Sequence, residues 1–355
     1  MASEWEIFCE SGPKGLIDVN WNDPQYRTSV VASLVKGVYR LENYRQQNCY
    51  LPQGLTLPWW ISFHFHLKDW LIDNDGTSIF GAIYEYKYPS PTQNIPHYVI
   101  AFRGTILESK DTMIRDFKVN LQCFFNDLHD NSSFKLAMDY VHNMVDIAGA
   151  GNVWLAGHSM GSAMALLAGK KMAEMGSPLE TYVFNPPYFS FPIELIKNEK
   201  VKRRIRIAKS VFKAGLSFAL KGGRLHDHFD GLSDWFPYLF VNPADPICSE
   251  YIGYFQNRNT MEEIGHGFGQ IERLATMYSL RSQMSSVLGM NFGSEASRLH
   301  HLPSAYLTIN TGQVPDPNAG RIKNFERAHE LQQWWEPSLS FQFMLYRYTT
   351  TASIE

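Results

Sequence analysis

One short motif places a serine where it could act as a nucleophile. Residues 157–161 read Gly-His-Ser-Met-Gly, a match to the G-x-S-x-G pattern with Ser159 at its centre. A serine hydroxyl attacks a carbonyl carbon only when a base takes its proton, a carboxylate orients that base, and fixed donors stabilise the oxyanion that forms. The motif therefore predicts acyl chemistry only if these partners are present, because so short a match also occurs by chance.

The residues around the motif predict a strand, a tight turn and a helix. Val153 to Ala156 form a short apolar run typical of a buried strand, and Ser162 to Met175 consist of helix formers. Such a turn holds Ser159 in a strained backbone conformation and brings the flanking chain segments close together. Gly157 and Gly161 have no Cβ atom that would clash there. An ordinary glycine-rich strand-to-helix turn is the alternative.

An acid is expected further along the chain, because the partners of a serine on such a turn follow in the order acid, then histidine. Asp245 lies three residues after the predicted strand Tyr238–Asn242. Functional groups gather at the carboxyl ends of parallel strands, so this position favours Asp245. A turn aspartate beside Pro246 is the alternative. Three other aspartates are rivals for this role: Asp227, Asp230 and Asp234. They lie before the strand Tyr238–Asn242, and no predicted strand directly precedes them.

Four histidines after this acid compete for the role of the base: His266, His300, His301 and His329. His300 and His301 precede the predicted strand Ser304–Asn310 and so lie at its wrong end, and His266 follows no clear strand. His329 comes after the carboxyl end of that strand, at the start of a predicted helix, and is favoured by the same topological rule. His266 and His301 remain alternatives, and any of the four could be a structural histidine.

Two backbone N–H groups are expected to stabilise the oxyanion. Met160 follows the nucleophile and supplies the first, and Thr105, after the predicted strand 97–103, supplies the second. The glycine before Thr105 permits a close approach, although a plain strand-ending turn is the alternative. We interpret Arg103 as a structural ion-pair residue and His158, beside the nucleophile, as a packing residue.

The remaining pattern predicts an α/β protein. Strands alternate with helices, which indicates a mostly parallel central sheet with helices on both faces. Further strands are predicted at 78–88, 181–185 and 340–348, and helices at 27–45, 132–147, 261–290 and 325–335. Residues 47–76 are rich in aromatic side chains and give no clear assignment. We expect residues 1–355 to form one domain, with 188–232, basic and then amphipathic, as a cap-like insertion.

Composition excludes some classes of partner. The 355 residues carry a net charge of −3, with 32 Lys and Arg against 35 Asp and Glu, so no global basic field favours nucleic acid. Widely spaced cysteines (Cys9, Cys49, Cys123 and Cys248) indicate reduced thiols in a cytoplasmic protein. No signal-peptide pattern or membrane-spanning apolar run is present, although the basic segment in 188–232 leaves peripheral membrane contact open. No cluster of metal ligands is apparent, so no cofactor is expected. The oligomeric state stays undetermined.

Several segments together resemble the class 3 (fungal-type) lipase family: Phe102–Thr105, Gly157–Gly161, Asn242–Ile247 and Ala328–His329. The chain is most similar to a plant branch often labelled GDSL esterase/lipase, although its serine lies in G-H-S-M-G and the sequence has no Gly-Asp-Ser-Leu. The resemblance covers most of residues 25–350. It implies an α/β-hydrolase fold and a triad of Ser159, Asp245 and His329 that acts on carboxylic esters.

The chain also departs from this family. The interfacial lipases of that family have an apolar lid helix after the F-R-G-[ST] segment, whereas residues 108–112 of this chain are polar. A polar lid would bind an oil surface poorly, and 188–232 is longer than its counterpart in the compact fungal enzymes. We therefore expect a serine carboxylesterase for a modest-sized ester, with aromatic esters among the candidates. A lipid acyl hydrolase of the triacylglycerol lipase or phospholipase A type, a non-catalytic ligand-binding scaffold and an acyltransferase are the alternatives.

Overall fold

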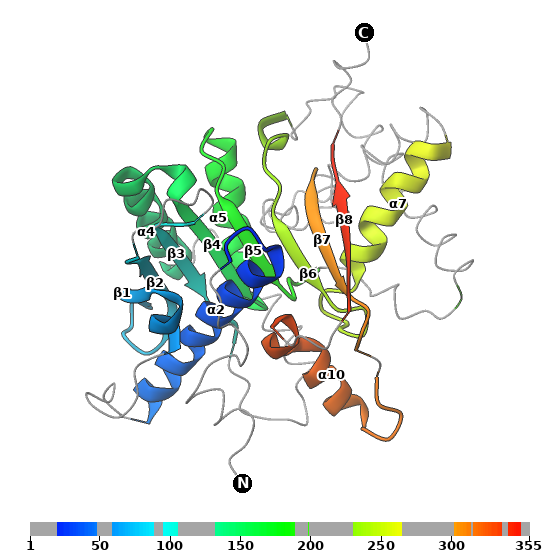
Figure 1. Ribbon diagram of the computed structural model, residues 1–355, viewed down its shortest axis with the longest axis horizontal. Coiled ribbons are helices and arrows are strands. Elements are labelled where there is room, and N and C mark those ends of the chain that lie inside the picture. The colour runs from blue at the N-terminus through cyan, green and yellow to red at the C-terminus, as the bar shows by residue number, and fades with distance from the viewer. Residues whose placement is uncertain are drawn as a thin grey trace, which may run out of the picture.

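The computed structural model describes residues 20–47, 59–88, 95–105, 132–188, 198, 230–264, 302–313, 315–335 and 340–348. Within these residues lies a single sheet of eight strands, which follow one another in sequence order from β1 to β8 (Figure 1). The strands are β1 Phe65–Ile72, β2 Ile79–Tyr86, β3 Tyr98–Phe102, β4 Val153–His158, β5 Glu180–Phe184, β6 Tyr238–Val241, β7 Ala305–Asn310 and β8 Phe341–Tyr346.

The middle of the sheet is parallel. Strands β3 to β7 run in one direction, while β1 and β2 on one side and β8 on the other are antiparallel additions. This confirms the prediction of a mostly parallel sheet. The register sets Phe102 beside Gly157 and His158 beside Phe184, so the segments that follow β3, β4 and β5 meet at one edge of the sheet.

Helices cover both faces of the sheet, as predicted (Figure 1). They are α2 Pro24–Gln46, α4 Ser132–Ala148, α5 Met160–Glu174, α7 Glu250–Ile264 and α10 Arg321–His329, with short 3₁₀ turns η1 Trp59–Phe63, η2 Ala150–Asn152, η4 Asp230–Leu232 and η6 Leu331–Trp334. Side chains alternate along each strand. Leu155 and Val183 therefore face the core under α4, α5 and α7, while Trp154 and Tyr182 face the core under α2, η1 and η6.

Helix α2 begins where its sequence supplies a cap. The side chain of Asp23 accepts a hydrogen bond of 2.9 Å from the N–H of Gln25, and Pro24 occupies the first helical position, where its missing N–H costs nothing. The helix then buries an apolar face that includes Val31 and Leu34 against the sheet. This packing fixes the position of Tyr39, on the same helix, relative to the end of β4.

Some sequence predictions need correction. A strand, β1, lies in the stretch 47–76 that received no assignment, and the predicted helix 325–335 is α10 followed by η6, so His329 ends a helix and does not start one. Most of 188–232 and of the predicted helix 261–290 lies outside the described residues, as do 108–112. None of the helices in the described part of the chain combines the length and apolar character needed to cross a bilayer.

Candidate active site

Ser159 occupies the sharp turn between β4 and α5. Its backbone has φ 56° and ψ −122°, a conformation that a residue with a side chain rarely adopts. The turn is possible because two glycines let the chain approach itself: a Cβ atom on Gly157 would stand under 3.0 Å from the backbone of Gly161, and one on Gly161 would stand as close to the backbone of Phe102. The predicted strained strand–turn–helix is therefore confirmed.

The structure brings Asp245 and His329 to this serine. Nε2 of His329 lies 3.0 Å from Oγ of Ser159, and Nδ1 of the same ring lies 2.8 Å from Oδ2 of Asp245. The Asp245 side chain is fully buried, and that of His329 is 12% exposed. His329 thus pairs with Asp245, and not with the described rival Asp234. The other rivals, Asp227, His266, His300 and His301, lie outside the described residues.

The Asp245 carboxylate is held by several donors besides His329. The N–H of Ile247 donates to Oδ1 at 2.9 Å, and the Asn185 amide donates to Oδ2 at 2.8 Å. The thiol of Cys248 lies 3.2 Å from Oδ2. Burial, and then the charge of Asp245, raise the pKa of this thiol well above its ordinary value, so the sulfur keeps its proton and donates. These contacts leave the carboxylate one orientation, in which Oδ2 faces the imidazole.

The carbonyl groups at the end of α10 are capped by side chains. The last turn of a helix leaves carbonyl oxygens without partners inside the helix. Four side-chain hydrogen bonds fill these positions: Gln313 to the oxygen of Arg327 at 3.0 Å, Asn185 and Gln333 to that of Ala328 at 2.9 and 2.8 Å, and His158 to that of His329 at 2.7 Å. The backbone that carries His329 is therefore tied to the ends of β4, β5 and β7.

The segment after β3 lies directly against Ser159. A Cβ atom on Gly104 would stand 2.8 Å from the Cβ of Ser159, so only glycine fits there without a shift. Arg103 donates to the carbonyl of Gly104 at 2.7 Å, and the hydroxyl of Tyr39 accepts the N–H of Gly104 at 2.7 Å. Because the two sides of a trans peptide point in opposite directions, Arg103 also fixes the direction of the Thr105 N–H.

Met160 is the first residue of α5. The first N–H groups of a helix have no partner within it, and the helix dipole favours negative charge at this end. Met160 directly follows Ser159, and Thr105 lies in the segment after β3, so their N–H groups come from two different segments.

Arg103 has a structural role. It donates hydrogen bonds to Ser78, to the carbonyl of Ile79 and to the carbonyl of Gly104.

His158 is more than the packing residue that the sequence suggested. Its Nδ1 lies 2.7 Å from the Tyr39 hydroxyl and its Nε2 lies 2.7 Å from the carbonyl oxygen of His329. Burial, and then the neighbouring His329, lower the pKa of His158 well below its ordinary value. The ring is therefore neutral near pH 7, with one nitrogen that donates and one that accepts.

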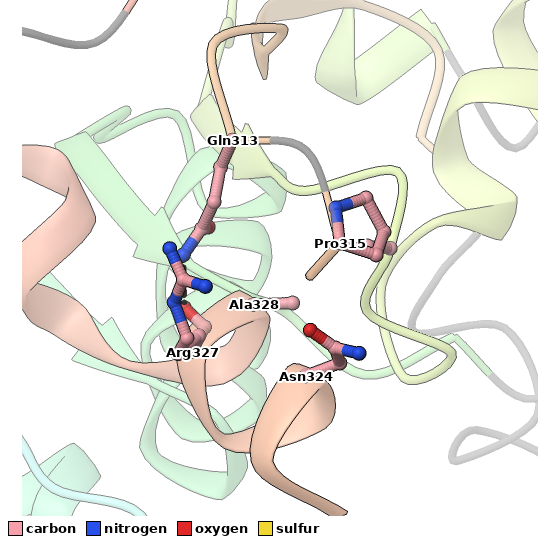
Figure 2. Close-up of a pocket in the computed structure, with 6 residues that line it drawn as sticks. Gln313, Pro315, Asn324, Arg327 and Ala328 are labelled. Carbon is pink, nitrogen blue, oxygen red and sulfur yellow. Dashed lines mark hydrogen bonds between the residues drawn. The ribbon is translucent and has the colours of Figure 1, made fainter. Parts of the chain in front are cut away.

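A small hollow is lined by the residues that directly precede Asp245 and His329, together with four others. It is lined by Ala244, Gln313, Pro315, Asn324, Arg327 and Ala328, and Figure 2 shows Ala328 with the longer side chains around it. The space open to the centre of a water molecule is about 10 Å³, which is room for about one water, so the hollow is too small for an ester. In the described part of the chain, no group of three His, Cys, Asp or Glu side chains is arranged to hold a metal ion.

Sequence reasoning missed Tyr39, Asn185 and Gln333. A signal existed for Asn185, because it is a polar residue directly after the buried strand β5, where functional groups gather. Tyr39 lies 119 positions before His158 on a helix, and nothing in its local sequence points to the site. Gln333 lies four residues after His329 in an aromatic segment that reads as core.

Comparison with known proteins shows which family and which relative this chain is similar to. The model of the family described as Lipase (class 3) matches residues 91–206, a range that contains both Thr105 and Ser159. A protein of Arabidopsis thaliana named "GDSL esterase/lipase At4g10955" is 41% identical over 367 aligned residues, which cover 98% of this chain and 99% of that protein.

Proposed function

This chain belongs to the class 3 lipase family of carboxylic ester hydrolases, and from that premise we propose that Ser159 is its nucleophile, His329 its base and Asp245 the residue that orients the base. One observation carries the proposal. The hydroxyl, the imidazole and the carboxylate form a continuous chain of hydrogen bonds of 3.0 and 2.8 Å. A serine with this geometry can lose its proton as it attacks.

The reaction follows from these positions. Ser159 attacks the ester carbonyl while Nε2 of His329 takes its proton, and Asp245 stabilises the imidazolium that forms. The oxyanion receives hydrogen bonds from the N–H groups of Met160 and Thr105. His329 then protonates the leaving alcohol, and a water molecule, activated by the same imidazole, cleaves the acyl-enzyme.

The proposed substrate is a modest-sized carboxylic ester, with aromatic esters among the candidates. The polar residues 108–112 support a dissolved ester over an oil droplet, because a polar lid gains little from an apolar surface. Rates on a soluble aromatic ester, a short p-nitrophenyl ester and an emulsified long-chain glyceride separate this proposal from a lipid acyl hydrolase. A rate that rises sharply above the solubility limit of the glyceride would favour the lipid acyl hydrolase.

Replacement of the nucleophile tests the proposed triad. Ser159→Ala is expected to lower kcat on the order of 10⁵- to 10⁶-fold, as for other serine hydrolases that lose their nucleophile. The change also removes labelling by a fluorophosphonate probe while the unfolding midpoint stays close to that of the wild type. Ser177→Ala, in the loop beyond the far end of α5, is the matched control and keeps full activity. Turnover by Ser159→Ala at the wild-type rate would refute the assignment.

A further inference from the structure

A row of hydrogen bonds joins the segment after β3 to the backbone of His329. The N–H of Gly104 donates to the Tyr39 hydroxyl at 2.7 Å, this hydroxyl lies 2.7 Å from Nδ1 of His158, and Nε2 of His158 lies 2.7 Å from the carbonyl oxygen of His329. The row connects α2, β4 and α10, three elements far apart in the chain. It passes beside the nucleophile, since His158 directly precedes Ser159.

Only one arrangement of protons satisfies the whole row. The carbonyl of His329 can only accept, so Nε2 of His158 carries the hydrogen. The buried ring is neutral, so its Nδ1 accepts a hydrogen bond from the hydroxyl of Tyr39. The oxygen of Tyr39 keeps a lone pair that accepts the N–H of Gly104. Every donor in the row therefore meets an acceptor, and the side chains of Tyr39 and His158 have fixed directions.

Both ends of this row reach groups that the reaction needs. At one end, Tyr39 holds the N–H of Gly104 and Arg103 holds the Gly104 carbonyl, so Gly104 is held on both sides. The Thr105 N–H belongs to the same peptide as that carbonyl, and its direction is set with it. At the other end, His158 holds the residue whose imidazole lies 3.0 Å from the Ser159 hydroxyl. A shift at either end would move a donor or the base relative to the reacting carbon.

We propose that Tyr39 and His158 are positioning residues that hold the oxyanion loop and His329 in a single geometry around Ser159. This inference rests on the proposed triad. Neither side chain takes part in the chemistry: the Tyr39 hydroxyl is used by Gly104 and His158, and both ring nitrogens of His158 are used by Tyr39 and His329. Their effect on the reaction acts through the groups that they hold.

Tyr39→Phe tests the inference at the first link. The change removes one oxygen, leaves the ring in place, and deprives the Gly104 N–H and Nδ1 of His158 of their partner. We expect kcat on a soluble ester to fall about 10- to 100-fold, as for other small misplacements of catalytic groups, with KM changed less than about threefold. Tyr44→Phe is the matched control, because its hydroxyl, on the same helix, accepts from Arg40 away from the site, and it keeps the wild-type kcat.

Two changes at His158 separate the two links. Asparagine places its carbonyl oxygen near the position of Nδ1 and keeps the contact with Tyr39, whereas glutamine places its N–H₂ near Nε2 and keeps the contact with the carbonyl of His329. We expect each variant to have a lower kcat than the wild type. The unfolding midpoint of each should stay close to that of the wild type. The double variant Tyr39→Phe with His158→Gln should lose less than the product of the two separate losses, since both changes break the same contact.

The outcomes distinguish this inference from the proposed function. Wild-type kcat in Tyr39→Phe and in both His158 variants, together with an inactive Ser159→Ala, would overturn the positioning role and leave the triad standing. Activity in Ser159→Ala would overturn the triad itself. A rise in KM with unchanged kcat would also contradict the inference, because it would place Tyr39 and His158 in substrate binding.

Discussion

The Asn185 amide donates a hydrogen bond of 2.8 Å to Oδ2 of Asp245, the carboxylate oxygen that also lies 2.8 Å from Nδ1 of His329. The same amide reaches the carbonyl of Ala328, and its oxygen accepts the indole N–H of Trp334 at 2.9 Å. Asn185 has φ 48°, a left-handed conformation that asparagine tolerates better than most residues. One fully buried side chain thus holds both the Asp245 carboxylate and the backbone next to His329.

Asn185→Asp should reduce activity without a change of side-chain shape. A second carboxyl group would then face Asp245 in a buried site, and the two would share a proton, because two buried carboxylates in contact cannot both ionise. We expect kcat at pH 7 to fall about tenfold or more. Asn152→Asp, at an exposed position before β4, is the control and should retain activity. Equal kcat for wild type and Asn185→Asp would show that this amide does not matter to the acid.

Gly104→Ala should disable the site while the protein stays folded. The new methyl group would stand 2.7 Å from the Tyr39 hydroxyl, 2.8 Å from the Ser159 Cβ and 2.9 Å from the carbonyl oxygen of His158, so the segment must move away from the nucleophile. Loss of one oxyanion donor costs about 10²- to 10³-fold in kcat, and we expect a loss of that order.

The matched control for Gly104→Ala is Gly151→Ala, because a Cβ placed on Gly151 meets no heavy atom within 4 Å beyond its two chain neighbours. This variant should match the wild type in both kcat and unfolding midpoint. If Gly104→Ala also retained the wild-type kcat, the segment after β3 would be free to adjust, and Thr105 would lose its proposed role.

Gln333→Met should lower stability by about 2–4 kcal/mol, because it leaves several buried polar groups without partners. The buried Gln333 side chain donates to the carbonyls of Ala328 and Glu330 and accepts from Asn242 and Asn310. Methionine has a similar length but forms none of these bonds well. Denaturant unfolding measures the change, and Gln332→Met, next in the chain and only partly buried, is the control. A difference below about 0.5 kcal/mol between the two variants would contradict this account.

The protein should become less stable as the pH decreases, partly because of His158. Its folded pKa is lowered by burial and then by His329, so the folded protein does not bind the proton that the unfolded chain binds below its ordinary pKa of about 6.5. The free energy of unfolding is therefore at its full value, as far as His158 is concerned, above that pH. It decreases as the pH falls below it. The groups that face this ring are Tyr39 and Lys36 from α2 and His329 from α10.

The measurement is the free energy of unfolding at pH 7.5, 6.5 and 5.5 for the wild type and for His158→Gln, which cannot titrate there. Between pH 6.5 and 5.5 the wild type should lose about 1 kcal/mol more than the variant, the linkage expected for one proton. Parallel curves would mean that His158 accepts a proton in the folded state.

Much of the fold could be predicted from local sequence. The strands β3 to β7 are short apolar runs between turn residues, and this pattern is typical of strands buried on both faces. Strand β1 was missed because it is an edge strand in which most side chains are exposed or partly exposed. The break after His329 was missed because Glu330 adopts an extended backbone between α10 and η6, where helix-forming residues run on without a stop signal.

The residues of the site also fall into those that local sequence predicts and those that it does not. Ser159 is marked by two glycines that its turn requires, and Asp245 and His329 are marked by their places after strands and by their order in the chain. Tyr39 and Gln333 act through side-chain hydrogen bonds that depend on how α2 and η6 pack against the sheet. No local pattern encodes such contacts, because the partners are separated by as many as 119 positions for Tyr39 and 91 for Gln333.

The order of the strands has a consequence for biosynthesis. Since β1 to β8 lie side by side in the order in which they are made, each new strand finds its neighbour already synthesised. Ser159 and the segment at Gly104 can therefore assemble early, whereas His329 arrives only with α10. On the proposed triad, a growing polypeptide has no base for the Ser159 hydroxyl until residue 329 has left the ribosome. Hydrolysis would then begin only after the strands up to β7 have been synthesised.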